Sequence, residues 1–156
     1  LKTGFIVALL NHSTIIVTLD ADGQHDAKYI RELTAPIERN EAEIVSGSRF
    51  IRNSISEVTT HRKIGIKFFN WIMGIITNQP HTDCTSGFKA IKAECLRSVF
   101  DELKENQYGT LEFLIKLSKR DIRLIEVPIP LIENPISSKG VLKFGYNLLR
   151  TIITYT

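Results

Sequence analysis

One short segment constrains the fold of this chain more than any other. Residues Thr14–Leu19 (TIIVTL) form an apolar, β-branched run that lacks the polar alternation of a surface strand. Such a run is typical of a strand buried on both faces, which needs neighbouring strands and covering helices. The run ends directly in Asp20-Ala21-Asp22, so it also places a pair of carboxylates at the carboxyl end of the predicted strand.

The rest of the chain alternates between strand-like and helix-like segments. Periodicity and punctuation predict strands at Thr14–Leu19, Glu43–Ser46, Phe88–Ile91 and Ile122–Val127, and helices at Leu1–His12, Ala27–Glu38, Arg62–Ile76, Lys92–Phe100, Leu111–Lys119 and Lys139–Thr154. This alternation predicts an α/β sandwich with a mostly parallel central sheet. No internal repeat or linker is visible, so we expect a single domain over residues 1–156. Its last helix, at 139–154, is amphipathic and either packs on the core or lies on a membrane surface.

The composition of the chain excludes several classes of protein. Apolar residues make up 43% of the chain, and the excess of Lys and Arg over Asp and Glu, 20 against 17, is not gathered in one block. These values are typical of a globular protein and argue against a nucleic-acid-binding one. Cys84 and Cys95 are too few for a disulfide framework or a four-thiolate zinc site, and they fit a reducing, cytoplasmic compartment. No apolar run reaches the ~18 residues of a membrane span.

The carboxylate pair after the first strand is the strongest chemical signal. Ligands of open α/β sheets bind beyond the carboxyl ends of the strands. Asp20 and Asp22 repel each other unless a cation or water lies between them, and their hard oxygens suit Mg²⁺ or Mn²⁺. Gln24 and His25 add an amide oxygen and an imidazole in the same turn. The alternative interpretation is a solvated acidic turn ahead of a helix for which Asp26 is the N-cap.

A set of segments gives this chain a resemblance to a known family. VTLDADGQHD resembles the signature of the family 2 glycosyltransferases, which are inverting enzymes of the GT-A (Rossmann-like) fold. Five further segments keep the family's order: LKTGF before this signature, and SGSRF, HRKIGIKFFN, TDCTSGFKAI and EVPI after it. Within the family, the chain is most similar to the dolichyl- or polyprenyl-phosphate sugar transferases. The resemblance implies metal-dependent transfer of a sugar from a nucleotide-sugar to an acceptor, with a polyprenyl or dolichyl phosphate as the expected acceptor and Mg²⁺ or Mn²⁺ as the cofactor.

The resemblance also implies roles for single residues. Asp20, Asp22 and Gln24 are the expected metal ligands, with the two aspartates facing the donor diphosphate. Asp83 of TDCTSGF matches an acidic residue on the acceptor side of the family's pocket, and it is the candidate catalytic residue. The alternative for Asp83 is a structural carboxylate that caps its own turn. Gly87 either allows a close backbone approach beside the sugar or serves as an ordinary turn glycine.

Further residues are expected to contact donor phosphates. The resemblance places Arg49 near phosphate. Arg62 lies at the start of a helix, where a cation is unfavourable unless an anion is nearby. The alternative for Arg62 and its neighbour Lys63 is that both are solvated and point away from the helix end. Ser138 and Lys139 match a Ser-Lys pair of the family, but the Arg that precedes this pair in the family is absent here.

Other histidines and one cysteine have simpler interpretations. His12, His61 and His81 fit no metal-ligand spacing and are expected at the surface. Cys84 has no His or Asn arrangement typical of a nucleophile, so we interpret it as a small buried side chain.

The resemblance does not cover the whole family domain, and other functions remain as alternatives. The family's N-terminal nucleotide-binding part has no counterpart in the sequence, so we expect a catalytic-domain fragment whose Thr14–Leu19 edge promotes self-association. The alternatives are a non-catalytic remnant of the fold and a metal-dependent nucleotidyl- or phosphotransferase that uses the same aspartates. The expected location is peripheral, at the cytoplasmic face of a membrane.

Overall fold

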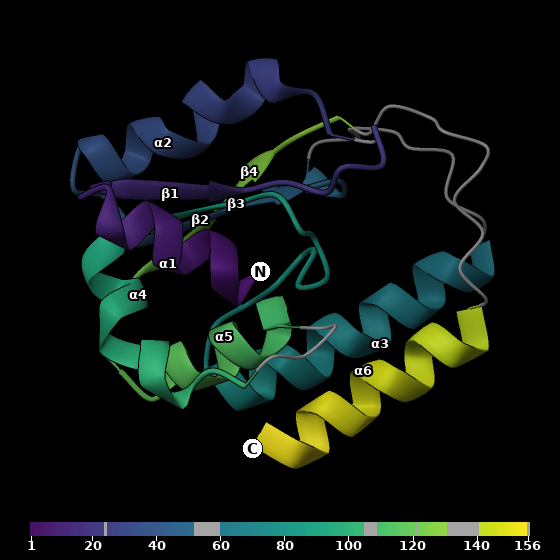
Figure 1. The fold of residues 1–156 in the computed structure, drawn as a ribbon. Helices are drawn as coiled ribbons and strands as arrows, with labels where there is room; N and C mark the ends of the chain where they lie inside the picture. The colour runs from purple at the N-terminus through teal and green to yellow at the C-terminus, as the bar shows by residue number, and fades with distance from the viewer. Residues whose placement is uncertain (24, 52–59, 105–108, 121, 131–140, 156) are drawn as a thin grey trace.

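The computed structural model describes residues 1–23, 25–51, 60–104, 109–120, 122–130 and 141–155. These residues form a sheet of four strands between two helical layers (Figure 1). The strands are β1 (Ile15–Thr18), β2 (Ile44–Ser48), β3 (Lys89–Lys92) and β4 (Leu124–Pro128), in the order β1-β3-β2-β4. The helices are α1 (Lys2–Leu10), α2 (Ile30–Glu38), α3 (Thr60–Thr77), α4 (Ala93–Val99), α5 (Gly109–Ser118) and α6 (Val141–Tyr155), with 3₁₀ turns at Ala27–Tyr29 and Phe100–Glu102.

The predicted α/β class is confirmed, and the sheet is mixed. β2 and β4 pair in parallel, whereas β3 is antiparallel to both β1 and β2, so β1, β2 and β4 run in one direction and β3 runs against them. The prediction of a mostly parallel sheet therefore holds for the direction of three strands and not for the pairing around β3. The chain enters β3 from a loop that lies at the carboxyl ends of β1 and β2, and this entry fixes the reversed direction.

Alternating side chains give the sheet two apolar faces. Val45 of β2 and Phe88, directly before β3, pack with Leu33 of α2 on one face. Ile44 and Ile91 belong to the cluster on the other face, which includes residues of α1, α4 and α5. Burial of each such side chain stabilises the fold by ~1.5–3 kcal/mol. These two clusters explain why α2 stands alone on its side of the sheet while several helices cover the opposite side (Figure 1).

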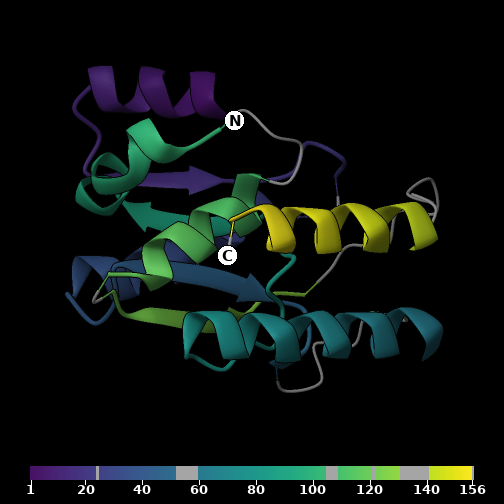
Figure 2. The same cartoon turned by 90° about the horizontal axis from the view of Figure 1, so that it is seen from below.

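The predicted elements are found close to their expected bounds. Asp26 caps the 3₁₀ turn that leads into α2, because its carboxylate accepts a hydrogen bond from the backbone N–H of Lys28 at 3.0 Å. The outer helices α3 and α6 extend beyond the carboxyl ends of β1 and β2 (Figures 1 and 2). In α6, Ile152 is buried while its neighbour Ile153 is exposed, so only part of the predicted apolar face packs on the core.

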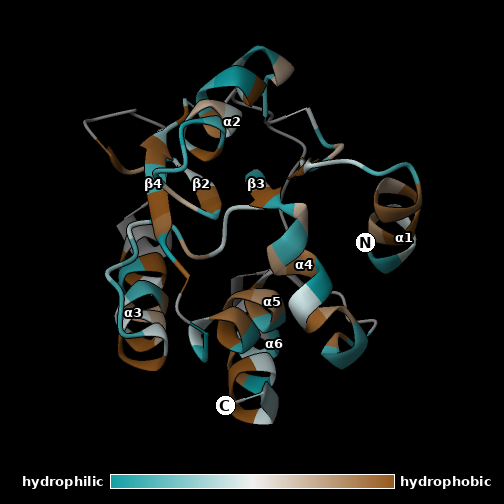
Figure 3. Ribbon diagram, turned by 90° about the vertical axis from the view of Figure 1, so that its left-hand side faces the viewer, coloured by the Kyte–Doolittle hydropathy of each residue, from teal (hydrophilic) through white to brown (hydrophobic). Residues whose placement is uncertain are grey.

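One side of the molecule carries an open strand edge and an apolar helix. β1 is an edge strand, and within the described ranges no strand pairs with its second side. The neighbouring α1 is apolar around much of its circumference (Figure 3), and Ile6, Val7 and Leu10 are exposed on it. Exposed edge strands pair readily with other chains. Self-association of the chain through this side therefore stays a prediction, and sedimentation of the purified protein measures it.

Candidate functional site

Three segments that are far apart in the sequence meet where β1 and β2 end. Asp20 follows β1 by two residues, Arg49 follows β2 directly, and residues 82–87 form the loop that leads into β3. The charge of Arg49 interacts with those of both Asp83 and Asp20, so the three segments share one electrostatic environment. The structure thus brings Asp20, Arg49 and Asp83 together, as expected for ligand-binding residues at the carboxyl ends of strands.

Asp83 and Arg49 form a buried, two-pronged ion pair. The Arg49 Nε donates to Asp83 Oδ2 at 2.5 Å, and Arg49 Nη2 donates to Asp83 Oδ1 at 2.7 Å. The backbone N–H of Arg49 also donates to Oδ2, and the Thr85 hydroxyl donates to Oδ1. Asp83 has no exposed surface and Arg49 is nine-tenths buried, so each charge depends on the other. In this arrangement Asp83 orients Arg49, and its predicted role toward an acceptor stays a prediction.

The Asp20 carboxylate rests directly on Gly87. A Cβ atom at position 87 would lie 2.5 Å from Asp20 Oδ2 and 2.6 Å from Oδ1, which is well inside van der Waals contact. The Gly87 carbonyl also accepts a hydrogen bond from the Thr18 hydroxyl at 2.8 Å, so strand β1 and the loop are tied together at this point. A side chain at position 87 would therefore displace the Asp20 carboxylate, which occupies that space.

We predict that Gly87→Ala displaces the Asp20 carboxylate and weakens Mn²⁺ binding in the presence of a nucleoside diphosphate. Loss of a residue that orients a metal ligand typically lowers metal affinity by about 10- to 100-fold. Gly65→Ala is the matched control, because a Cβ there meets nothing within 4 Å. Calorimetric titration of both variants measures the difference. Equal Mn²⁺ affinity in Gly87→Ala and Gly65→Ala would contradict the predicted role of Asp20.

His25 lies beside these carboxylates in a half-buried position. Its ring packs on Phe88, with 5.1 Å between the ring centroids, and its Nδ1 is buried without a hydrogen-bond partner in the described part of the chain. Burial lowers the pKa of His25 below its usual value, although Asp20, Asp22 and Asp83 act in the opposite direction. A neutral imidazole with an open nitrogen is therefore held at the edge of the site at neutral pH.

The aspartates after β1 fit a hard divalent cation whose coordination shell is completed by substrate phosphates and water. Asp20 and Asp22 are both exposed at the turn after β1, and Asp20 is held in place by its contact with Gly87. No three His, Cys, Asp or Glu side chains lie close enough to enclose a metal among the residues that the structure describes. Mg²⁺ commonly binds through one or two carboxylates together with substrate phosphates and water. The residues present fit that mode of binding and do not fit an all-protein zinc cage.

Several predicted positions are outside the described residues, and one expectation is wrong. Gln24, Ser138 and Lys139 lie outside the described ranges, and Arg62 lies in the first turn of α3 with its side chain undescribed. His81 was expected at the surface, but its side chain is only 2% exposed. The His81 ring lies 2.7 Å from the Thr77 hydroxyl and faces Glu126, and this polar contact inside the fold explains its burial.

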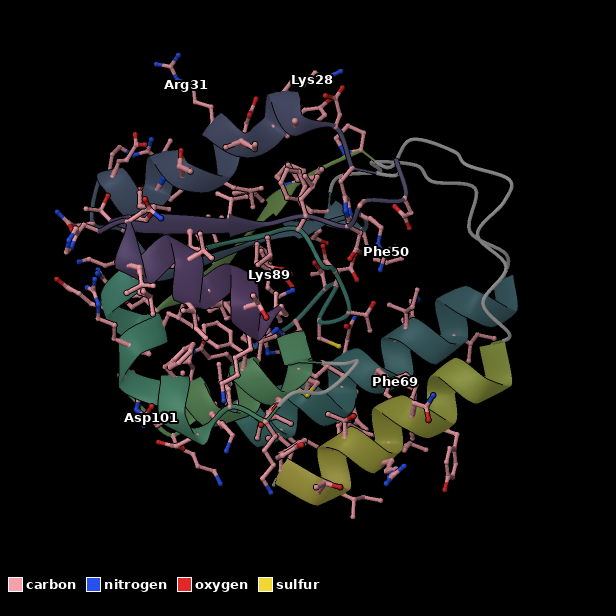
Figure 4. The ribbon with its side chains drawn as sticks, viewed as in Figure 1. Lys28, Arg31, Phe50, Phe69, Lys89 and Asp101 are labelled. Carbon is pink, nitrogen blue, oxygen red and sulfur yellow. The ribbon has the colours of Figure 1, made fainter. Side chains whose placement is uncertain are left out.

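A buried polar row crosses the sheet beneath the loop. Thr18, Lys89, Ser46 and Glu126 are register partners on β1, β3, β2 and β4 in turn, so they lie side by side. Lys89 has no exposed surface and donates to the carbonyl of Ser86, on the side of the sheet away from α2 (Figure 4). Burial lowers the pKa of Lys89, while Asp83, Cys84 and Glu126 raise it. Lys89 thus lies within electrostatic range of Arg49, Asp83 and Glu126 inside the fold.

Lys89, Glu126 and Asn70 were not identified as candidate residues from the sequence. Glu126 and Asn70 are nevertheless recognisable in the sequence. Glu126 is the acidic residue in an otherwise apolar strand, and Asn70 is an amide within the long apolar helix α3. Polar side chains at buried positions are retained when they have partners. A search for polar residues inside apolar elements would have found them, although it would not have named the partners.

A groove of about 950 Å³ lies along α3 and is bordered by Phe50 and by the start of the loop that leads into β3. Phe50 and Thr82, which adjoin Arg49 and Asp83 in the sequence, line one part of it, and Trp71 and Ile75 of α3 line another. Figure 4 shows Phe50 at the carboxyl end of β2, on the same side as the extended end of α3. Trp71 is 64% exposed and Ile75 is 65% exposed, so this part of α3 presents apolar surface to its surroundings. Within the described residues no helix is both long and apolar enough to cross a bilayer.

A family profile and several related proteins all connect this chain with glycosyltransferases. The profile of the family described as Glycosyl transferase family 2 matches residues 8–100. An uncharacterized protein of Methanocaldococcus jannaschii is 32% identical over 98% of this chain and 65% of its own length. The UDP-N-acetylglucosamine–dolichyl-phosphate N-acetylglucosaminyltransferase of Methanococcus voltae is 32% identical over 86% of this chain and 55% of its own length. The undecaprenyl-phosphate mannosyltransferase of Micrococcus luteus is 26% identical over 85% of this chain and 55% of its own length. The chain therefore spans less than two thirds of the length of these relatives.

Proposed function

The chain belongs to glycosyl transferase family 2, and on this footing we propose that it transfers a sugar from a nucleotide-sugar donor to a polyprenyl phosphate. One observation carries the proposal: the Asp20 carboxylate, which rests on Gly87, and the buried Arg49–Asp83 pair lie together, and the next residue in the chain after Arg49 and the one before Asp83 line a mostly apolar groove. Relatives whose names specify dolichyl phosphate and undecaprenyl phosphate as acceptors support the choice of a lipid phosphate.

The donor side of the site is proposed to involve the turn after β1. Asp20 and Asp22 would hold Mg²⁺ or Mn²⁺, and a divalent cation there supplies Lewis-acid stabilisation of the leaving nucleoside diphosphate. Gly87 fixes the position of Asp20 by leaving room for its carboxylate. His25 stays uncharged near neutral pH, so it can exchange hydrogen bonds with a polar donor group without adding a charge. Gln24, Arg62, Ser138 and Lys139 remain the further candidates for donor contacts.

The acceptor side is proposed to involve Asp83 and also Arg49, which the sequence placed among the candidates for donor phosphate contacts. Inversion at the anomeric carbon requires attack from the face opposite the leaving diphosphate, through a transition state of oxocarbenium character like that of glycoside hydrolysis. A lipid phosphate is already an anion, so it needs little help from a general base. Arg49 supplies positive charge at the position where such an anion would approach, and Asp83 keeps its guanidinium in a fixed orientation.

The exposed apolar residues on the outer face of α3 support a peripheral membrane location, for which the cytoplasmic side stays a prediction. Ile64, Phe68, Trp71 and Ile75 are exposed apolar residues of this helix, and Trp71 and Ile75 also line the groove. Contiguous exposed apolar surface on a helix is typical of a membrane or protein contact. An isoprenoid chain in the groove would enter from the bilayer while its phosphate faces Arg49.

The single tryptophan of the chain gives a direct test of this placement. We predict that vesicles containing undecaprenyl phosphate shift the fluorescence of Trp71 to shorter wavelength, because the exposed indole moves into an apolar environment. Ile75→Glu places a charge on the same face and is expected to weaken vesicle binding by at least about tenfold. Val7→Glu, on the exposed face of α1, is the matched control. Equal vesicle affinity of both variants would exclude α3 as the contact.

The proposed reaction is tested by product analysis. The protein is incubated with a panel of nucleotide-sugars, undecaprenyl phosphate in vesicles and Mn²⁺, and the sugar in the organic phase is measured together with the released nucleotide. Glycosyl transfer yields a lipid-linked sugar and a nucleoside diphosphate in equal amounts. Release of a sugar 1-phosphate would instead indicate nucleotidyl transfer. No turnover with any donor would indicate a non-catalytic remnant of the fold.

A further inference from the structure

The loop that carries Asp83 is held by side chains to which the proposed reaction gives no task. Asn70 of α3 reaches the main chain on both sides of Asp83: its Nδ2 donates to the Thr82 carbonyl at 2.5 Å, and its Oδ1 accepts from the Cys84 N–H at 2.9 Å. Asn70 is only 8% exposed, so this amide is buried with both of its polar atoms satisfied by the loop. A single side chain therefore bridges the residues that flank Asp83.

Glu126 of β4 holds the same loop through a second set of hydrogen bonds. Its Oε2 accepts from the Thr82 N–H at 2.8 Å and also from the Thr82 hydroxyl, while its Oε1 accepts from the Asp83 N–H at 3.1 Å. Hydrogen bonds from N–H groups to a charged carboxylate are stronger than bonds between neutral groups. Together, Asn70 and Glu126 engage the N–H groups of three consecutive residues, Thr82, Asp83 and Cys84.

The position of Asp83 in turn fixes the guanidinium of Arg49. Both carboxylate oxygens of Asp83 accept from Arg49, so a shift of the loop would move or break this pair. Apolar neighbours on α3, such as Phe69 and Met73, already join this helix to the core. The amide of Asn70 adds no apolar packing, and its bonds serve the geometry of the loop.

We propose that Asn70 and Glu126 are positioning residues, which hold Asp83 and thereby orient Arg49 toward the acceptor phosphate. The reaction part of this inference rests on the proposed function, whereas the loop geometry can be measured without a substrate. Misplacement of a reacting group by about 1 Å costs on the order of 10²-fold in rate. The clamp formed by Asn70 and Glu126 thus acts on turnover through the loop, and Asn70 also lines the groove proposed for the lipid.

The test compares Asn70→Leu and Glu126→Gln with a matched control, Glu43→Gln. Glu43 accepts from the backbone N–H and the guanidinium of Arg123 and is far in sequence from the loop, so its variant removes a comparable charge elsewhere. In both clamp variants we expect kcat to fall by about 10- to 100-fold with the donor KM nearly unchanged. Amide hydrogen exchange at residues 82–84 is expected to accelerate at least about tenfold, while exchange along β2 stays at the wild-type rate.

Two results would overturn the proposal. Wild-type exchange at residues 82–84 in Asn70→Leu and Glu126→Gln would show that the clamp does not hold the loop. Acceleration along β2 as well as in the loop would reduce both residues to general support of the fold. If the wild-type protein transfers no sugar, the proposed function fails, but local acceleration at 82–84 would still support the clamp.

Discussion

Asp20→Asn and Asp22→Asn are each expected to lower sugar transfer by about 10³-fold, because each removes a charge that we propose holds the cation against the departing diphosphate. The Asp20 carboxylate lies over Gly87, in the space that a side chain there would fill. A neutral amide keeps the size of the side chain, so the loss reports charge and ligation. Calorimetric titration with Mn²⁺ in the presence of a nucleoside diphosphate measures the binding step separately from turnover.

Asp26→Asn provides the control for this pair of variants. Asp26 lies in the same acidic turn, but its carboxylate caps a 3₁₀ turn through the N–H of Lys28. Asparagine is an equally good cap, so stability and metal affinity should stay near the wild-type values. Asp22→Asn with unchanged metal affinity would return the turn to the alternative interpretation of a solvated acidic cap.

Asp83→Asn is expected to affect both stability and turnover. The change leaves the Arg49 charge nine-tenths buried and without its partner, and breaking a buried pair in this way costs about 3–5 kcal/mol in the free energy of unfolding. If Asp83 also positions the acceptor, kcat falls by about 10²-fold or more with smaller effects on donor binding. Urea unfolding and steady-state kinetics on the same sample separate the two effects.

A double variant distinguishes the structural part of this effect from the functional part. Arg49→Met combined with Asp83→Asn removes both charges, and replacing a buried ion pair by neutral residues is often neutral for stability. We therefore expect the double variant to recover much of the stability that Asp83→Asn loses, while turnover stays low. Recovery of turnover in the double variant would show that neither charge takes part in the reaction.

Local patterns were sufficient to predict the secondary structure. The β-branched run before Asp20 and the 3.6-residue periodicity of Arg62–Ile76 depend on neighbours within one element, and both elements are found near their predicted bounds. The reversed direction of β3 was not predictable in this way. It depends on where the preceding loop is anchored, and that anchoring involves Asn70 and Glu126, which lie more than ten residues from the loop residues they bind.

In the candidate site too, the residues in local motifs were predictable and the contacts between distant segments were not. Asp20, Asp22, Arg49 and Asp83 follow from motifs at strand ends, and the structure gathers Asp20, Arg49 and Asp83 around the loop. The ion pair between Asp83 and Arg49 and the contact of Asp20 with Gly87 could not be predicted, because each joins segments more than thirty residues apart. The burial of His81 has the same origin, since Glu126 comes from a distant strand.

The location of the cation and the diphosphate tests the account most directly. Mn²⁺ is titrated into the isotopically labelled protein with a nucleoside diphosphate, and paramagnetic broadening of the backbone NMR signals is mapped onto the sequence. The account predicts that broadening is strongest at Asp20, Asp22 and Gly87, and that it is lost in Asp20→Asn. Broadening centred on another acidic segment, such as Asp101 and Glu102, or equal broadening in Asp20→Asn, would contradict it.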